Sequence, residues 1–121
     1  MPIVDMPIEK LENYKGTNSI PKDFHSFWDE RMEEVEGHKL NYRIEKSEIN
    51  GFDFCNYYDL WFTGINGEKV YVKYIKPKVS YDIPIILQFH GYPGASRGWF
   101  EQSSFAGMGC AVLAMDCPGQ G

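Results

Sequence analysis

The sequence has 121 residues, a net charge of −5 and aromatic side chains at 16% of its positions. A chain of this length and apolar content can build one modest packed core. The acidic balance excludes a nucleic-acid binder that works through the phosphate backbone, and it disfavours an anionic membrane as partner, because both need a basic face. No run approaches the roughly 20 apolar residues of a membrane helix and no apolar signal core opens the chain, so a cytoplasmic location is expected.

The first part of the chain is predicted to be helical. Pro7 opens a short stretch with apolar residues at helical spacing, which ends at Gly16. A longer helix is expected from about Pro21 to Gly37, because apolar residues there follow the i, i+3, i+4 pattern and acidic residues occupy the other face. Its apolar stripe consists of Phe24, Phe27, Trp28, Met32 and Val35.

The pattern then changes to a period of two, which is typical of half-buried strands. Apolar and polar residues alternate over 40–45 and again over 57–63. The pair Asn66-Gly67 predicts a hairpin, since both residue types tolerate positive φ. The returning strand covers 70–76 and is stopped by a proline, so these segments together form an antiparallel meander.

A third pattern follows, in which segments 83–89 and 110–115 are almost continuously apolar. Such runs are typical of parallel strands that are covered on both faces. The span 96–107 between them could hold a short crossing helix. The order predicts an α/β fold, with the glycine-rich loop 90–98 at the C-terminal end of a strand, where ligand chemistry in such sheets lies.

This loop, HGYPGASRG, allows three interpretations. The word GASRG is similar to the phosphate loop of short-chain dehydrogenases, and Asp116 ends the next strand where a ribose contact would lie. Against a dinucleotide site, Phe100 occupies the position of the last small residue in that pattern. A purely structural corner between strand and helix is the second possibility.

The third interpretation is an oxyanion loop, in which fixed backbone N–H groups stabilise the charge that grows on a carbonyl oxygen during ester hydrolysis. The Tyr92 N–H is then the natural donor, because Gly91 lets the backbone turn sharply and Pro93 has no N–H to offer. His90 is interpreted as a hydrogen-bond partner that shapes the loop, since no serine or cysteine nucleophile motif accompanies it. The scattered histidines lack metal-ligand spacing, and neither a metal nor a cofactor is expected.

The chain as a whole carries a family pattern: FxxFW in the longer helix, the hairpin YDLWFTGINGEKVYVKYIKP, the run IPIILQFHGY and the ending GCAVLAMDCPGQG. In this order the segments resemble the N-terminal part of the acetyl xylan esterase and cephalosporin-C deacetylase family of serine esterases. The resemblance implies an α/β-hydrolase fold, Ser-His-Asp chemistry on acetylated xylo-oligosaccharides or cephalosporin-type acetyl esters, homo-oligomers, and the Tyr92 N–H as one oxyanion donor. The chain departs from the family at Pro118, where an arginine is usual.

The serine nucleophile, the catalytic acid and the catalytic histidine of such an enzyme are not present, because the chain contains no G-x-S-x-G elbow. We therefore interpret it as a single N-terminal segment of an α/β-hydrolase domain that is inactive alone. Its expected parts are a helical lead-in at 1–37, antiparallel strands and hairpin at 38–77, and the start of the parallel sheet with the oxyanion loop at 78–121. The alternatives are an NADP-binding Rossmann-type oxidoreductase fragment and a non-catalytic assembly module.

Overall fold

The computed structural model describes residues 5–120, which fall into one unit ending at Glu36 and another beginning at Gly37. The first unit holds a short helix, α1 (Ile8–Leu11), and most of a longer one, α2 (Phe24–Gly37). Both helices are near the positions that the apolar spacing predicts. Of the helices in residues 5–120, none is long and apolar enough to cross a membrane.

The aromatic residues of α2 contact one another along the helix. The ring of Trp28 meets the rings of Phe24 and Phe27 edge to face, at centroid distances of 6.3 and 5.3 Å. Arg31 and Glu34 form an i, i+3 ion pair on the same helix. The predicted apolar stripe is thus present, but its side chains stay about half exposed. Local side-chain pairs of this kind add only about 0.2–0.5 kcal/mol each to helix stability.

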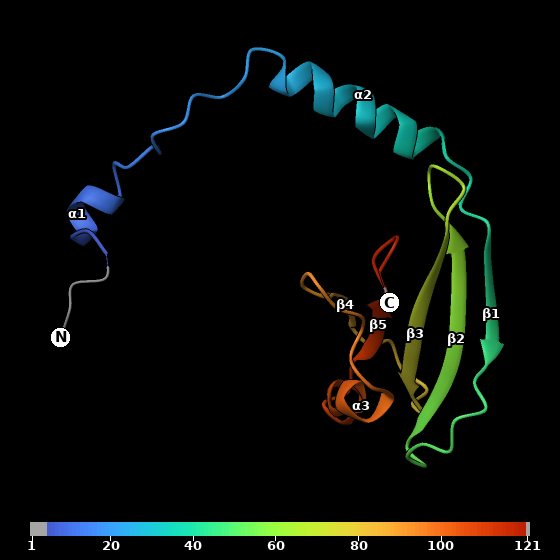
Figure 1. Cartoon of the computed structure of the whole chain (residues 1–121). Coiled ribbons are helices and arrows are strands. Elements are labelled where there is room, and N and C mark those ends of the chain that lie inside the picture. The colour runs from blue at the N-terminus through green and yellow to red at the C-terminus, as the bar shows by residue number, and fades with distance from the viewer. Residues whose placement is uncertain (1–4, 121) are drawn as a thin grey trace. The chain divides into compact units, whose positions relative to one another are not determined.

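The second unit contains a five-stranded mixed sheet, in the order β1-β2-β3-β5-β4 (Figure 1). Neighbours are antiparallel except for β4 and β5, which are parallel and are joined through helix α3 (Trp99–Gly107). The predicted succession of an antiparallel meander and a parallel pair with a crossing helix is confirmed. The strands are β1 (Tyr42–Lys46), β2 (Cys55–Thr63), β3 (Lys69–Pro77), β4 (Ile85–Phe89) and β5 (Ala111–Met115).

The hairpin between β2 and β3 turns through a glycine. Gly67 has φ of +84° and donates its N–H to the carbonyl of Gly64, while the Gly64 N–H returns to the Glu68 carbonyl. Asn66 keeps a negative φ. The Asn-Gly pair therefore predicts the position of the turn correctly, but only Gly67 adopts the left-handed conformation. Some hairpin turns place a single glycine with positive φ at their end.

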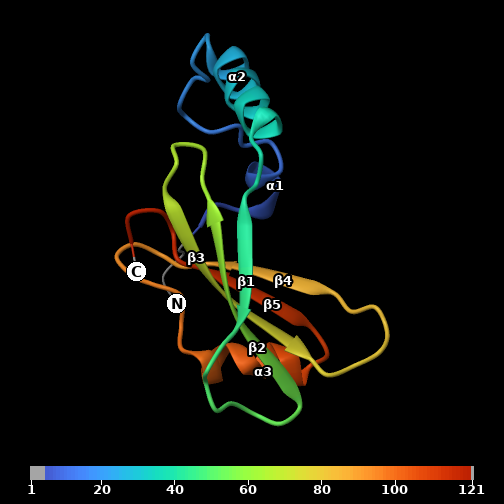
Figure 2. The same ribbon diagram turned by 90° about the vertical axis from the view of Figure 1, so that its right-hand side faces the viewer.

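Helix α3 covers one face of the sheet, where it contacts β3 and β5 and lies behind the strands in Figure 2. The core lies between them, and Ile75 and Val112 at its centre are completely buried. The ring of Tyr57 packs edge to face on Trp99 at 5.8 Å. The full core cluster consists of Cys55, Tyr57, Ile75, Ala106, Val112 and Ala114.

The opposite face of the sheet is apolar and is not covered by any element of the second unit. The side chains of Ile85, Leu87 and Phe89 are 59–66% exposed there, and a shallow hollow of about 530 Å³ runs across neighbouring strands. The prediction that β4 is covered on both faces is therefore wrong for the described residues. An almost continuous apolar run shows that the side chains on both faces of β4 are suited to burial. In the described residues only one of these two faces has an apolar contact. Within the described residues, β4 is an edge strand and its outer edge is unpaired.

Candidate functional site

The glycine-rich loop leaves the C-terminal end of β4 and leads into α3. It borders a hollow of about 780 Å³. A Cβ placed on Gly94 would come within 2.9 Å of the Gly91 carbonyl oxygen, so the loop is tightly curled at this point. Tyr92 lies inside the curl and is 87% exposed. Within residues 5–120 its backbone N–H donates to no acceptor.

His90 fixes the beginning of the loop. Its Nε2 accepts a hydrogen bond of 2.9 Å from the Cys117 N–H, and its Nδ1 lies 3.1 Å from the Gly91 carbonyl oxygen. A backbone N–H can only donate and a carbonyl can only accept, so Nε2 is unprotonated and Nδ1 carries the proton. Both ring nitrogens are thus occupied by backbone groups, an arrangement that suits a histidine that shapes a loop.

Ser96 fixes the other end. Its N–H donates to Asp116 Oδ1 at 2.6 Å, and its Oγ accepts a hydrogen bond of 2.6 Å from Lys73 Nζ. Burial opposes the charge on Asp116, but hydrogen bonds from Ser96 and the positive charge of Lys73 outweigh it, so the pKa of Asp116 is lowered. The carboxylate is therefore ionised at neutral pH and is engaged by the loop.

A second polar pair lies next to these groups on the same face of the sheet. The Tyr71 hydroxyl donates to Asp59 Oδ1 at 2.5 Å across β2 and β3. Burial raises the pKa of Tyr71, and the hydrogen bond and negative charge of Asp59 raise it further. The Tyr71 carbonyl also accepts the Asp116 N–H at 2.9 Å. Tyr71 therefore adds a backbone hydrogen bond to Asp116, the residue whose carboxylate accepts the Ser96 N–H.

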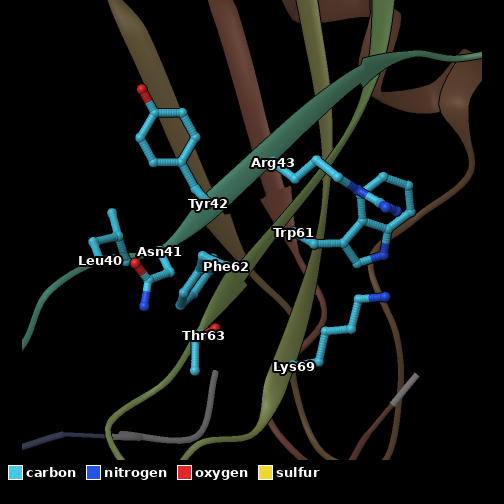
Figure 3. A pocket seen from close by; sticks show the side chains of 8 residues that line it. All are labelled: Leu40, Asn41, Tyr42, Arg43, Trp61, Phe62, Thr63 and Lys69. Atoms are coloured by element: carbon cyan, nitrogen blue, oxygen red, sulfur yellow. The ribbon is translucent and has the colours of Figure 1, made fainter.

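Another hollow, of about 600 Å³, lies at the edge strand β1 (Figure 3). The indole of Trp61 points into it, with the Arg43 guanidinium 4.6 Å and the Lys69 ammonium 5.3 Å from the ring centroid. These are cation–π distances. The residues that line this hollow include no carboxylate, histidine or thiol, which are the common metal-ligating side chains.

A family model of acetyl xylan esterase (AXE1) matches residues 1–121, the whole chain. The chain belongs to the acetyl xylan esterase family. Two solved structures are similar to this family member. Acetyl xylan esterase 1 from Thermoanaerobacterium sp. JW/SL YS485 is 38% identical with a TM-score of 0.85, and the match covers 97% of this chain and 37% of that one. An acetyl xylan esterase from Paenibacillus sp. R4 is 29% identical with a TM-score of 0.80, and the match covers 96% and 38%.

The chain thus spans little more than a third of the length of these acetyl xylan esterases. The resemblance inferred from the sequence is confirmed, and so is the fold, an open α/β sheet that matches their N-terminal part. The NADP-binding alternative is not supported, and the Asp116 carboxylate that it assigns to a ribose accepts the Ser96 N–H instead. Within residues 5–120, no group of three or more metal-ligating side chains is placed to hold an ion.

The structure brings His90, Gly91, Tyr92 and Pro93 together in one anchored loop, and the Tyr92–Pro93 peptide is cis. Sequence reasoning missed the groups that anchor it. Lys73 lies in a strand that reads as ordinary alternation, and the Cys117 N–H belongs to the backbone, where no side-chain pattern marks it. Only Asp116, a carboxylate directly after an apolar strand, carried a visible signal.

Proposed function

We propose that this chain is the N-terminal part of a carbohydrate esterase that removes acetyl groups from acetylated xylo-oligosaccharides or cephalosporin-type esters by serine hydrolase chemistry. In this proposal the chain supplies one oxyanion donor, the Tyr92 N–H. The observation that carries it is this N–H: it has no acceptor within the described residues and lies on a loop that is anchored at both ends. Family membership supports the esterase class.

The chemistry follows from the position of the donor. When a serine attacks an acetyl ester, the carbonyl oxygen becomes an oxyanion, and an N–H that is already held in place stabilises it without reorganisation. A donor from the loop after an early strand and a second from the residue after the nucleophile make the usual pair in α/β-hydrolases. The Tyr92 side chain has no part in this, because only its backbone N–H is required.

The chain has no nucleophile elbow, so the test needs an enzyme that supplies one. A chimera can join residues 1–121 to the remaining C-terminal part of the Thermoanaerobacterium esterase, whose matching segment is 38% identical. Replacing Tyr92 by its α-hydroxy acid analogue exchanges the N–H for an ester oxygen and keeps the side chain. We expect kcat for p-nitrophenyl acetate to fall by about 10²–10³. The Tyr92→Phe chimera is the control and should keep its kcat, because its N–H is unchanged.

An unchanged kcat in the α-hydroxy analogue would exclude Tyr92 as a donor. The 121-residue chain by itself is expected to show no serine-dependent turnover. Hydrolysis that is lost on treatment with a serine-directed phosphonate would contradict the proposal that the nucleophile lies outside this chain.

Homo-oligomerisation and a cytoplasmic location stay predictions of the sequence. The exposed apolar face of β4 supports self-association, since an unpaired edge strand with an apolar face invites pairing. Sedimentation velocity at rising concentration tests this for the 121-residue chain. A single monomeric species at high concentration would contradict it.

A further inference from the structure

Both ends of the glycine-rich loop are held by two consecutive residues, Asp116 and Cys117. We propose that Asp116, Ser96 and Lys73 are positioning residues, which place the Tyr92 N–H where an oxyanion forms. This inference rests on the proposed esterase function and adds to it the groups that fix the donor. None of the three side chains needs to touch the substrate.

The sheet explains why the two anchors converge. Strands β4 and β5 are parallel and in register, with Phe89 opposite Met115. The residues that follow these two strands are therefore neighbours, and His90 reaches the Cys117 N–H at 2.9 Å. The loop then curls and returns, so that the Ser96 N–H meets the Asp116 carboxylate at 2.6 Å. Tyr92 lies between two fixed points on the same dipeptide.

Lys73 adds a third support from another strand. It lies on β3, opposite Ala114 of β5, and its Nζ donates to Ser96 Oγ at 2.6 Å and approaches the Ser96 carbonyl at 3.4 Å. Its positive charge also favours the ionised form of Asp116 and lowers the pKa of that carboxyl. Charge-assisted hydrogen bonds of this length are among the stronger ones in proteins. Ser96 is therefore held through its side chain by Lys73 of β3 and through its backbone by Asp116, the residue that follows β5.

The rigidity of these contacts matters because catalysis depends steeply on donor position. A misplacement of about 1 Å can cost roughly 100-fold in rate. Loss of an anchor should therefore lower kcat and leave KM nearly unchanged, because the donor acts on the transition state and not on the bound ester. A residue that only stabilised the fold would lower the melting temperature without this separation.

The test uses the chimera with residue 116 changed in two ways. Asp116→Leu removes the acceptor for the Ser96 N–H, and we expect kcat for p-nitrophenyl acetate to fall about tenfold or more with KM within about twofold. Asp116→Asn keeps an acceptor oxygen at the same place and should retain most of the activity. The kcat of Lys73→Met should lie between the values of these two variants. Lys76→Met, an exposed lysine on the same strand, is the control and should match the unsubstituted chimera.

All rates are measured well below the melting temperature of each variant. A folded Asp116→Leu chimera with unchanged kcat would overturn the inference. Failure of the proposed function has a different signature: the unsubstituted chimera is folded but inactive, or the Tyr92 α-hydroxy analogue retains full kcat.

The anchors can also be tested in the 121-residue chain without catalysis, by ¹⁵N NMR. The Ser96 amide proton should move upfield as Asp116 is protonated, and this titration should be lost in Asp116→Asn. The His90 ring ¹⁵N shifts should show the Nδ1–H tautomer that the two backbone hydrogen bonds require. A Ser96 amide that ignores Asp116 protonation would overturn the inference even where the chimera does not fold.

Discussion

The hydroxyl of Tyr57 joins α3 to the sheet, and its removal gives a sharp test of the packing. It accepts the Phe52 N–H at 3.0 Å and lies 2.9 Å from Ser103 Oγ, which itself donates to the Trp99 carbonyl at 2.7 Å. The Ser103 proton is thus used, so the Tyr57 hydroxyl donates to Ser103. In Tyr57→Phe the ring still fills its place, but both hydrogen bonds are lost.

The magnitude follows from burial. Tyr57 is 5% exposed, so water cannot easily replace its hydroxyl beside Phe52 and Ser103. Each net hydrogen bond is worth about 1 kcal/mol. We therefore expect Tyr57→Phe to lower the free energy of unfolding by about 2 kcal/mol.

Urea unfolding followed by tryptophan fluorescence measures this, since Trp99 packs on the Tyr57 ring. With a typical slope of about 1–3 kcal/mol per molar urea, the midpoint should fall by roughly 1 M. The matched control is Tyr58→Phe on the same strand, whose ring stacks on Tyr74 at 5.3 Å and which has no hydrogen bond through its hydroxyl within residues 5–120. Equal midpoint shifts in the two variants would refute the hydrogen-bond account.

Three further predictions concern the loop and the core. Gly94→Ala should lower kcat of the chimera about tenfold, because its Cβ would lie 2.9 Å from a backbone oxygen, whereas Gly107→Ala, with 3.9 Å to its nearest neighbour, should not; equal rates would contradict the curl. The lowered pKa of Asp116 contributes stability above its ordinary value of 3.8 that is lost as pH falls through the lower folded value. The stability difference from Asp116→Asn should therefore be constant above about pH 5 and shrink toward about pH 2 in urea titrations; a difference independent of pH would contradict it. Ile75→Ala should cost about 2–5 kcal/mol and Ile85→Ala under about 1 in the same assay, and similar losses would place the core elsewhere.

Much of the fold can be predicted from the sequence because its signals are local. The period of two in 40–45 and 57–63, the Asn-Gly turn and the unbroken apolar runs each depend on neighbouring residues, and the structure has strands and a hairpin there. The cover on β4 could not be predicted this way, because an apolar run shows a preference for burial and not the element that provides it.

In the candidate site, too, the local features can be predicted from the sequence and the long-range contacts cannot. His90, Gly91 and Tyr92 stand next to one another and carry a family pattern, so the sequence points to them. Lys73 and Ser96 are 23 residues apart, and only the register of β3 against β5 brings them together. Their contact depends on the tertiary structure. Lysine and serine are both common residues, so their positions in the sequence do not predict this hydrogen bond.

The convergence of both anchors on Asp116 and Cys117 has a consequence for the evolution of loop length. Because one dipeptide holds His90 and Ser96, the segment between them begins and ends at nearly the same place. Residues can therefore be inserted or deleted between the anchors without displacing β4, β5 or α3, as is common for surface loops on a rigid scaffold. Such changes would alter the exposed surface between the two anchors, and with it the position of Tyr92, while both ends of the loop stay fixed on the sheet.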